Sequence, residues 1–239
     1  IPQWSNMDNI RWLSQEGNDR WAAEVFDFAH GKFFVDAGAT GGHNNSAWVL
    51  ETDFNWQGIS VNANREHYAH IVKQQRMNVD CNALWSHDNG VDFFFNSIAD
   101  MTTSAATSFK NTTHDLSYLS AVTQGDILPK FRKILENEAT VINVPSITLE
   151  QLLQKYNAPT TIDYLALDIE GAEYEVLSVF PFDRYNIQIM SIENTHDFQI
   201  FLEEKGFTRV VNPYCPKPHE HHYVNNTIIS EYPFDIWTL

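Results

Sequence analysis

Short apolar segments rich in β-branched and aromatic residues alternate along this chain with amphipathic segments of helical period. Residues 32–37, 58–62, 78–84, 163–168 and 187–192 form the apolar segments. Apolar runs of this length without polar alternation are typical of parallel strands that are covered on both faces. The alternation therefore predicts an α/β fold with a doubly wound, mostly parallel sheet.

The intervening segments carry the usual signals for helix ends. Residues 19–30, 46–54, 65–76, 148–156, 172–180 and 198–205 predict helices, with Gly31 and Gly206 as end signals and Gln151 completing a capping box. Residues 223–229 and 235–239 lack helical period and predict an antiparallel strand pair that completes the sheet. We expect one domain over residues 1–239, with an insertion over the ligand-bearing edge, or a plain surface loop, at about 97–140.

Acidic side chains dominate the charge. The chain has 31 Asp and Glu against 15 Lys and Arg, a net charge of −16. This charge repels polyanions, so we expect no nucleic-acid partner and no contact with an anionic membrane. The sequence does not indicate an oligomeric state.

The cysteines and the glycosylation sequons give little information about the cellular compartment of the protein. Cys81 and Cys215 permit one disulfide at most. Sequons at Asn44, Asn111 and Asn225 are about as many as chance would give in a chain this rich in Asn, Ser and Thr. We expect the secretory lumen or secretion ahead of the cytoplasm.

A glycine-rich turn follows the first predicted strand. The strand includes Asp36, and the turn contains Gly38, Gly41 and Gly42 before the next helix. Dinucleotide-binding folds prefer Gly-x-Gly-x-x-Gly at this place, because pyrophosphate must approach bare backbone. A carboxylate beside the turn repels phosphate and suits an ammonium group. The segment predicts either a cradle for a small ligand or an ordinary tight turn.

Acids end two further predicted strands. Asp168 and Glu170 follow one strand, and Glu193 and Asn194 follow the next. Ligands of open α/β sheets bind at the carboxyl ends of the strands, so these residues could act on a ligand, or they could be helix N-terminal acids. The second role is the one expected for Glu173. Oxygen ligands from Asp168, Glu193 and Asn194 could also bind Mg²⁺ or Mn²⁺.

Several histidines lie near these segments. His43 follows the glycine turn and His196 follows Asn194, so either could be a general base or a solvated loop residue. The run HEHH at 219–222, with Cys215 before it, fits no known spacing of zinc ligands.

Three segments in this order resemble FkbM-type methyltransferases: VDAGATGG at 35–42, WQGISVNAN at 56–64 and IDYLALDIEGAE at 162–173. Residues 14–21 and 190–194 also match the pattern of that family, and the resemblance covers about residues 14–207. It implies a Rossmann-like class I methyltransferase fold. It also implies transfer of a methyl group from S-adenosylmethionine to a hydroxyl of a glycan or another small polar acceptor.

The resemblance also suggests roles for residues. The turn would hold the methionine part of the cofactor, with Asp36 near its ammonium. The implied cofactor-binding residues are Asp36, Gly38, Ala39, Gly42, Asn62 and Asp168, and the implied candidates for catalysis are Asp168, Glu170 and His196.

Asn62 is the main departure from the family, which usually has Glu or Asp there to bind both ribose hydroxyls. An amide oxygen accepts a hydrogen bond without charge assistance, which makes it weaker by about 1 kcal/mol. The alternative function is therefore a degenerate methyltransferase-fold protein that only binds a small ligand.

Overall fold

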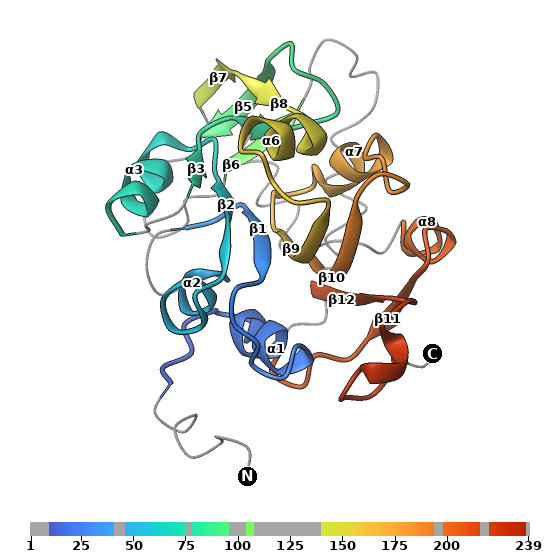
Figure 1. The fold of residues 1–239 in the computed structure, drawn as a ribbon. Coiled ribbons are helices and arrows are strands. Elements are labelled where there is room, and N and C mark those ends of the chain that lie inside the picture. The colour runs from blue at the N-terminus through green and yellow to red at the C-terminus, as the bar shows by residue number, and fades with distance from the viewer. Residues whose placement is uncertain are drawn as a thin grey trace, which may run out of the picture.

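The computed structural model describes residues 10–40, 46–74, 78–95, 104–107, 140–193, 198–215 and 220–237. Its centre is a seven-stranded sheet of order β11-β12-β10-β9-β1-β2-β3, with helices on both faces (Figure 1). The mutually parallel strands are β1 (Phe33–Ala37), β2 (Gln57–Val61), β3 (Asn78–Asp80), β9 (Thr161–Leu167) and β10 (Asn186–Glu193). The predicted α/β fold with a mostly parallel sheet is confirmed.

The far edge of the sheet differs from the prediction. β12 (Glu220–Asn225) runs antiparallel to β10 and to β11 (Phe207–Val210). The predicted pairing of residues 223–229 with 235–239 is wrong: Ile229–Glu231 is a 3₁₀ helix, and Ile236 makes only an isolated bridge to Val210. Four consecutive side chains of β12, from His221 to Val224, are buried, as expected of a strand flanked on both sides rather than at an edge.

Helices pack on the two faces of the sheet. α1 (Asn18–Val25) and α2 (Trp48–Phe54) cover one face, and α6 (Leu149–Lys155), α7 (Glu173–Ser178) and α8 (Gln199–Glu204) contribute to the core on the other. α3 (Arg65–Gln74) lies beside β3. The capping box of Thr148 and Gln151 is present at the start of α6. α1 ends before Gly31, because Asp27 and Phe28 adopt left-handed conformations.

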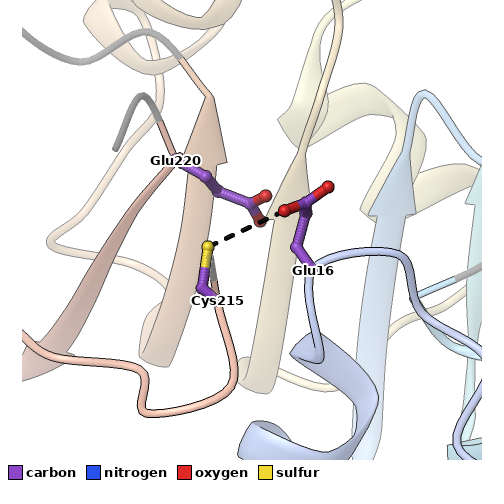
Figure 2. A group of neighbouring side chains, drawn as sticks. All are labelled: Glu16, Cys215 and Glu220. Atoms are coloured by element: carbon purple, nitrogen blue, oxygen red, sulfur yellow. Dashed lines mark hydrogen bonds between the residues drawn. The ribbon is translucent and has the colours of Figure 1, made fainter. Parts of the chain in front are cut away.

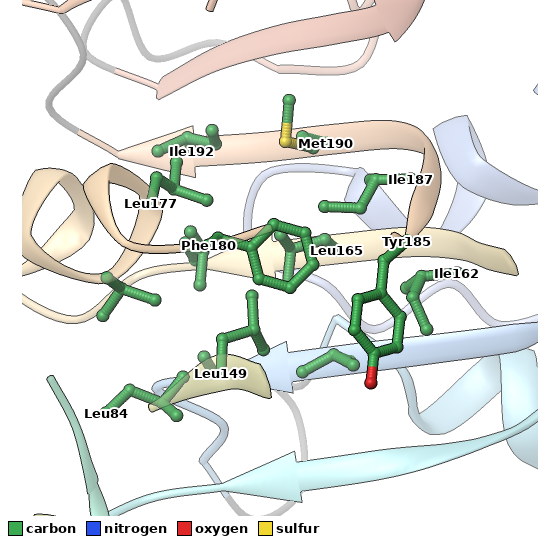
Figure 3. Close-up of a cluster of buried hydrophobic side chains, with 14 of the residues drawn as sticks. Leu84, Leu149, Ile162, Leu165, Leu177, Phe180, Tyr185, Ile187, Met190 and Ile192 are labelled. Atoms are coloured by element: carbon green, nitrogen blue, oxygen red, sulfur yellow. The ribbon is translucent and has the colours of Figure 1, made fainter. Parts of the chain in front are cut away.

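Alternation along most of each central strand separates two cores. Figure 3 shows Leu165, Met190 and Ile192 packed with Leu177 and Phe180 on the α6–α7–α8 face. Residues one position away in β1, β9 and β10 face α1 and α2 instead, including Phe34, Tyr164 and Ile189. Apolar burial on both faces fixes the register of these strands, because a slip of one residue would exchange the two faces.

Two small sheets complete the described chain. β4 (Ala83–Leu84) leaves the line of β3 and pairs with β8 (Ser146–Ile147), so residues 78–84 are two strands and not the single one predicted. β5 (Val91–Phe95) pairs antiparallel with β6 (Ser104–Thr107) and β7 (Thr140–Val144). Phe93 and Trp85 pack there against Ala63 and Ala172, next to the carboxyl ends of β2 and β9.

Most of the predicted insertion at 97–140 lies outside the described residues. None of the described helices is long and apolar enough to cross a membrane.

Candidate functional site

The carboxyl ends of β1, β2 and β9 are tied together by backbone hydrogen bonds. The N–H of Gly38, directly after β1, donates to Val61 O at 3.0 Å, and the N–H of Asp168, directly after β9, donates to Ala37 O at 3.0 Å. Parallel strands bring their carboxyl ends to one edge, so the predicted residues at these ends share a site.

At Gly38 the turn after β1 lies in close contact with the end of β9. Its φ is +86°, and a Cβ built on it would lie 1.7 Å from the carbonyl oxygen of Asp168. Both the left-handed conformation and the lack of space exclude any side chain here. The β1 turn therefore presents bare backbone directly against the end of β9.

Asp36 lies under this turn, on the face of the sheet that α1 and α2 cover. Its side chain is 3% exposed, and among the described residues its Oδ2 has no hydrogen-bond partner. Burial raises the pKa of Asp36 to about 7, against a hydrogen bond from the backbone N–H of Ala47 that lowers it. A buried carboxylate oxygen without a donor is costly, and an added cation would offset that cost.

Asn62 follows β2 and is hydrogen-bonded at both ends of its amide. Its Nδ2 donates to Ala39 O at 2.8 Å, and its Oδ1 accepts from the N–H of Asn64 at 2.8 Å. The amide therefore braces the glycine turn against the turn after β2. A carboxylate could not donate to Ala39 O, which gives Asn at this position a structural reason that the sequence did not reveal.

Three acids at the ends of β9 and β10 lie together. Carboxylate oxygens of Asp168, Glu170 and Glu193 are within 4.8 Å of one another. The pKa of Glu193 is raised to about 8. Burial is the main cause, the nearby Glu170 carboxylate acts in the same direction, and a hydrogen bond with Asp168 acts in the opposite direction. Asp168 is exposed, and Glu170 adopts a left-handed φ of +58°.

Glu173 is structural, in a more specific way than a helix-dipole role. It is 1% exposed, and its Oε1 accepts hydrogen bonds from the N–H groups of Ile169 at 3.0 Å and Gly171 at 3.2 Å. Burial raises its pKa to about 8. Glu173 thus holds the turn that presents Glu170 at the edge of the sheet.

Three of the predicted site residues, Gly42, Asn194 and His196, lie outside the described residues, as does His43. The structure therefore brings Asp36, Gly38, Ala39, Asn62, Asp168, Glu170 and Glu193 to one edge and does not test the others.

Two hollows of about 120 Å³ each open at this edge and share Gly38, Thr40 and Asp168. The first, here called the β2 hollow, is lined by two acids, Asp168 and Glu170, and otherwise mostly by neutral and apolar residues that include Asn62, Ala63, Asn82, Leu84, Phe93 and Ile169. The second, here called the acidic hollow, is lined by Glu16, Asp36, Asp168, Glu193 and Glu220, together with Ser14, Asn18 and Ser191. Among the described residues, no lysine or arginine lines the acidic hollow.

Glu16 and Glu220 are site residues that the sequence did not single out for this role. Glu16 precedes α1, and Glu220 begins β12, whose antiparallel direction places its start beside the carboxyl ends of the other strands. The sequence signals were the resemblance of residues 14–21, which include Glu16, to the family pattern, and the HEHH run, which includes Glu220. His222 of that run packs on Trp21, with ring centroids 4.7 Å apart, and burial lowers its pKa to about 3.

A scan of protein families matches residues 36–224 to the methyltransferase FkbM domain. The chain belongs to the FkbM methyltransferase family. The match contains every described residue of both hollows except Ser14, Gln15, Glu16 and Asn18. The comparisons of this FkbM domain with curated proteins and with solved structures found no match.

In this FkbM domain, the segment before Asp36, including residues 14–21, lies outside the family match. α1 nevertheless contributes Trp21 to the core, and the loop before it contributes Glu16 to the acidic hollow. The family match thus contains most of the shared edge of the sheet, and Glu16 adds a wall from outside the matched range.

Proposed function

We propose that the protein is an S-adenosylmethionine-dependent O-methyltransferase that acts on a hydroxyl of a glycan or another small polar acceptor. The observation that carries the proposal is the pairing of bare backbone at Gly38 with the buried, partnerless Oδ2 of Asp36. The first brings the β1 turn directly against the end of β9, where both hollows open, and the second favours a ligand that is positively charged.

The topology supports the proposal. A parallel sheet with β12 inserted antiparallel next to β10 fits the Rossmann-like class I methyltransferase fold expected from the family. The site also lies between β1 and β9, where the strand order reverses direction in the chain, which is the usual ligand site of open α/β sheets.

The residues fit the cofactor at both ends. Asp36 would hold the ammonium of the methionine part, and the Gly38–Ala39 backbone would lie along it. The β2 hollow would take the adenosine, with the free lone pair of Asn62 Oδ1 toward the ribose and Leu84 and Phe93 as apolar walls. When bound, S-adenosylmethionine supplies a methyl group on a positively charged sulfur.

Asp168 and Glu193 would interact with the methyl acceptor. Asp168 is exposed at the boundary of the two hollows, so it is our candidate for accepting the proton of the acceptor hydroxyl. Glu193, with a pKa of about 8, carries a proton near pH 7 in the ligand-free protein and would donate a hydrogen bond. Positioning supplies most of the rate gain, since methyl transfer needs little covalent help from the protein.

A metal-assisted variant of this mechanism stays a prediction. Of the expected ligands Asp168, Glu193 and Asn194, the first two lie together with Glu170, and Asn194 lies outside the described residues. Mg²⁺ or Mn²⁺ bound there would orient and acidify vicinal hydroxyls. Restoration of activity by Mg²⁺ after treatment with a chelator would support this variant.

Calorimetry with S-adenosylhomocysteine tests the proposal. We expect binding, and added stability of about 2.7 kcal/mol when the ligand is at a hundred times its dissociation constant. ATP serves as the control and should not bind, because its phosphates would face the acidic edge. Absence of S-adenosylhomocysteine binding at millimolar concentration would refute the proposal. Binding without methyl transfer to any hydroxyl of a monosaccharide panel would favour the alternative of a degenerate ligand-binding protein.

A further inference from the structure

Glu16, Cys215 and Glu220 converge from three separate parts of the chain. Figure 2 shows the Glu16 carboxylate, from the loop before α1, facing the Cys215 thiol and the Glu220 carboxylate of β12. One potential ligand atom from each of the three lies within 4.8 Å of the other two. The thiol donates to Glu16 Oε2 across 3.9 Å.

The two loops that carry these residues are in direct contact. Gly17, next to Glu16, has a φ of +66°, and a Cβ on it would lie 2.4 Å from Cβ of Tyr214, the residue before Cys215. Only glycine permits this approach. The proximity of Glu16 to Cys215 therefore follows from backbone packing and not from flexible side chains alone.

A buried polar network fixes the carboxylate of Glu220 from behind. Asn18 Nδ2 donates to Glu220 Oε1, and Asn18 Oδ1 lies 2.8 Å from His222 Nε2. Asn212 Nδ2 lies 3.0 Å from the same ring nitrogen, so Asn18, Asn212 and His222 form one polar cluster. Asn212 Nδ2 donates to Asn18 Oδ1 at 3.3 Å and to the backbone oxygen of Glu16 at 3.4 Å. Asn18, Asn212 and His222 are each at most 5% exposed.

Among the described residues, the space that the cluster adjoins is lined by carboxylates and by no lysine or arginine. Glu16 and Glu220 both line the acidic hollow, where the 97% buried Asp36 has an oxygen without a partner and, within the described chain, no lysine or arginine side chain enters. Added positive charge would stabilise this group of carboxylates. The ammonium expected at Asp36 satisfies one end, and the end at Glu16 and Glu220 has a thiol close by.

We propose that Glu16, Cys215 and Glu220 bind a zinc ion, with the fourth coordination position open to the acidic hollow. One sulfur and two carboxylate oxygens are ligands that Zn²⁺ accepts, and three protein ligands with one open position are typical of its non-structural sites. Ligand atoms around tetrahedral zinc lie roughly 3.3–3.8 Å apart, so small side-chain rotations would close the observed spacing. Binding would deprotonate Cys215, whose proton is released to solvent as the Zn–S bond forms.

This site differs from the acid group of Asp168, Glu170 and Glu193. Its network of Asn18, Asn212 and His222 corresponds to the outer shell that orients metal ligands in proteins. In the proposed methyltransferase, the open position would take an oxygen of the acceptor, and that role rests on the proposed function. The binding of the metal ion does not depend on the proposed function.

Cobalt substitution tests the site, with the second cysteine of the chain as a matched control. We expect one Co²⁺ per chain, displaced by Zn²⁺, with a thiolate-to-metal charge-transfer band in the near ultraviolet. Cys81 is exposed and free, so Cys81→Ser should keep the band, whereas Cys215→Ser should abolish it. Glu16→Gln and Glu220→Gln should each weaken Co²⁺ binding about tenfold or more, and Asn18→Ala by roughly 10–100-fold.

A measurement on Cys81→Ser alone keeps the test valid if the other variants fail to fold. Zn²⁺ should protect its one remaining thiol from alkylation by iodoacetamide. No charge-transfer band in this variant, or no protection, would overturn the proposal. Loss of the band in Asp168→Asn would also overturn it, since the ion would then belong to the other acid group. The binding of S-adenosylhomocysteine to metal-free protein is measured separately, so failure of the zinc site and failure of the proposed function are distinguishable.

Discussion

The two hollows at the carboxyl edge share a boundary and differ in charge. The β2 hollow has amide and apolar walls from β2, β4 and β5, and its two acids are Asp168, at the boundary with the acidic hollow, and Glu170. The acidic hollow is lined by five carboxylates from five different segments. The same backbone ridge at Gly38 thus separates a site suited to a neutral, planar group from a site suited to positive charge.

The difference arises from which face of the sheet each hollow adjoins. Asp36 and Ser191 point to the α1–α2 face, where the acidic hollow opens, and Val61 and Leu84 belong to the core of the opposite face. An antiparallel β12 adds the start of a strand, with Glu220, to the acidic side only. One ligand that spans the ridge would therefore meet two distinct environments.

Substitution of Gly38, which lies between the two hollows, should have the largest effect on stability and ligand binding. Gly38→Ala would place a methyl group 1.7 Å from Asp168 O at a φ of +86°. We expect a loss of about 3–5 kcal/mol in the free energy of unfolding, from combined overpacking and left-handed strain, and loss of ligand binding in both hollows. Denaturant unfolding measures it.

Gly31→Ala is the matched control for this loss. Gly31 also has a positive φ, +72°, but its added Cβ would have no heavy atom within 4 Å. It should lose only the conformational part, about 1–2 kcal/mol. Equal losses in the two variants would contradict the close approach of β1 and β9.

Asp168→Asn should separate chemistry from stability at the boundary. Asp168 is exposed, and the hydrogen bond to Ala37 comes from its backbone, so we expect the free energy of unfolding to change by less than about 1 kcal/mol. Loss of a general base should lower methyl transfer to a monosaccharide panel by about 10²–10⁴-fold. Asp183→Asn, an exposed aspartate before β10 at the opposite end of the sheet, is the control and should retain activity. An unfolded Asp168→Asn variant would instead make this carboxylate structural.

Asp36→Asn should affect the acidic hollow alone, and it should change how the free energy of unfolding depends on pH. Because the pKa of Asp36 is raised from 3.8 to about 7, folded protein binds a proton more tightly than unfolded protein does. Its contribution to stability is therefore complete below pH 3.8 and is lost as the pH rises to about 7, by about 4 kcal/mol at most. The variant should lack this decline in unfolding experiments from pH 4 to 8.

The raised pKa values of Glu173 and Glu193 are common to the unsubstituted protein and to Asp36→Asn. The difference between the pH profiles of their unfolding free energies therefore isolates the contribution of Asp36. Ligand binding sharpens the comparison further. Asp36→Asn should weaken S-adenosylhomocysteine, which carries the ammonium, and leave the binding of 5′-methylthioadenosine, which lacks it, unchanged. Equal weakening of both ligands would mean that the hollows are not independent.

Much of this site followed from local pattern. A buried apolar run followed by a glycine turn predicts a strand that ends at a ligand-bearing edge, and the strand that ends before Asp168 does so for the same reason. The rule that parallel strands place their carboxyl ends together then brings Gly38 and Asp168 to one edge without any tertiary information. Boundaries were less accurate, as in the strand predicted at 78–84, because β4 leaves the sheet to pair with a distant segment, β8.

The sequence by itself determined the parallel sheet, its apolar register and the residues at the ends of its central strands, since these depend on period and on neighbours along the chain. The tertiary structure alone decided that Asn62 braces Ala39, that Glu173 holds a turn and that Glu16 lies beside Cys215 and Glu220. The Glu173 contacts are local, whereas the Asn62 contact joins two different turns and the last one joins residues about 200 positions apart. The partners of Glu16 are selected by the direction of β12 and by the approach of Gly17 to Tyr214, which no local pattern encodes.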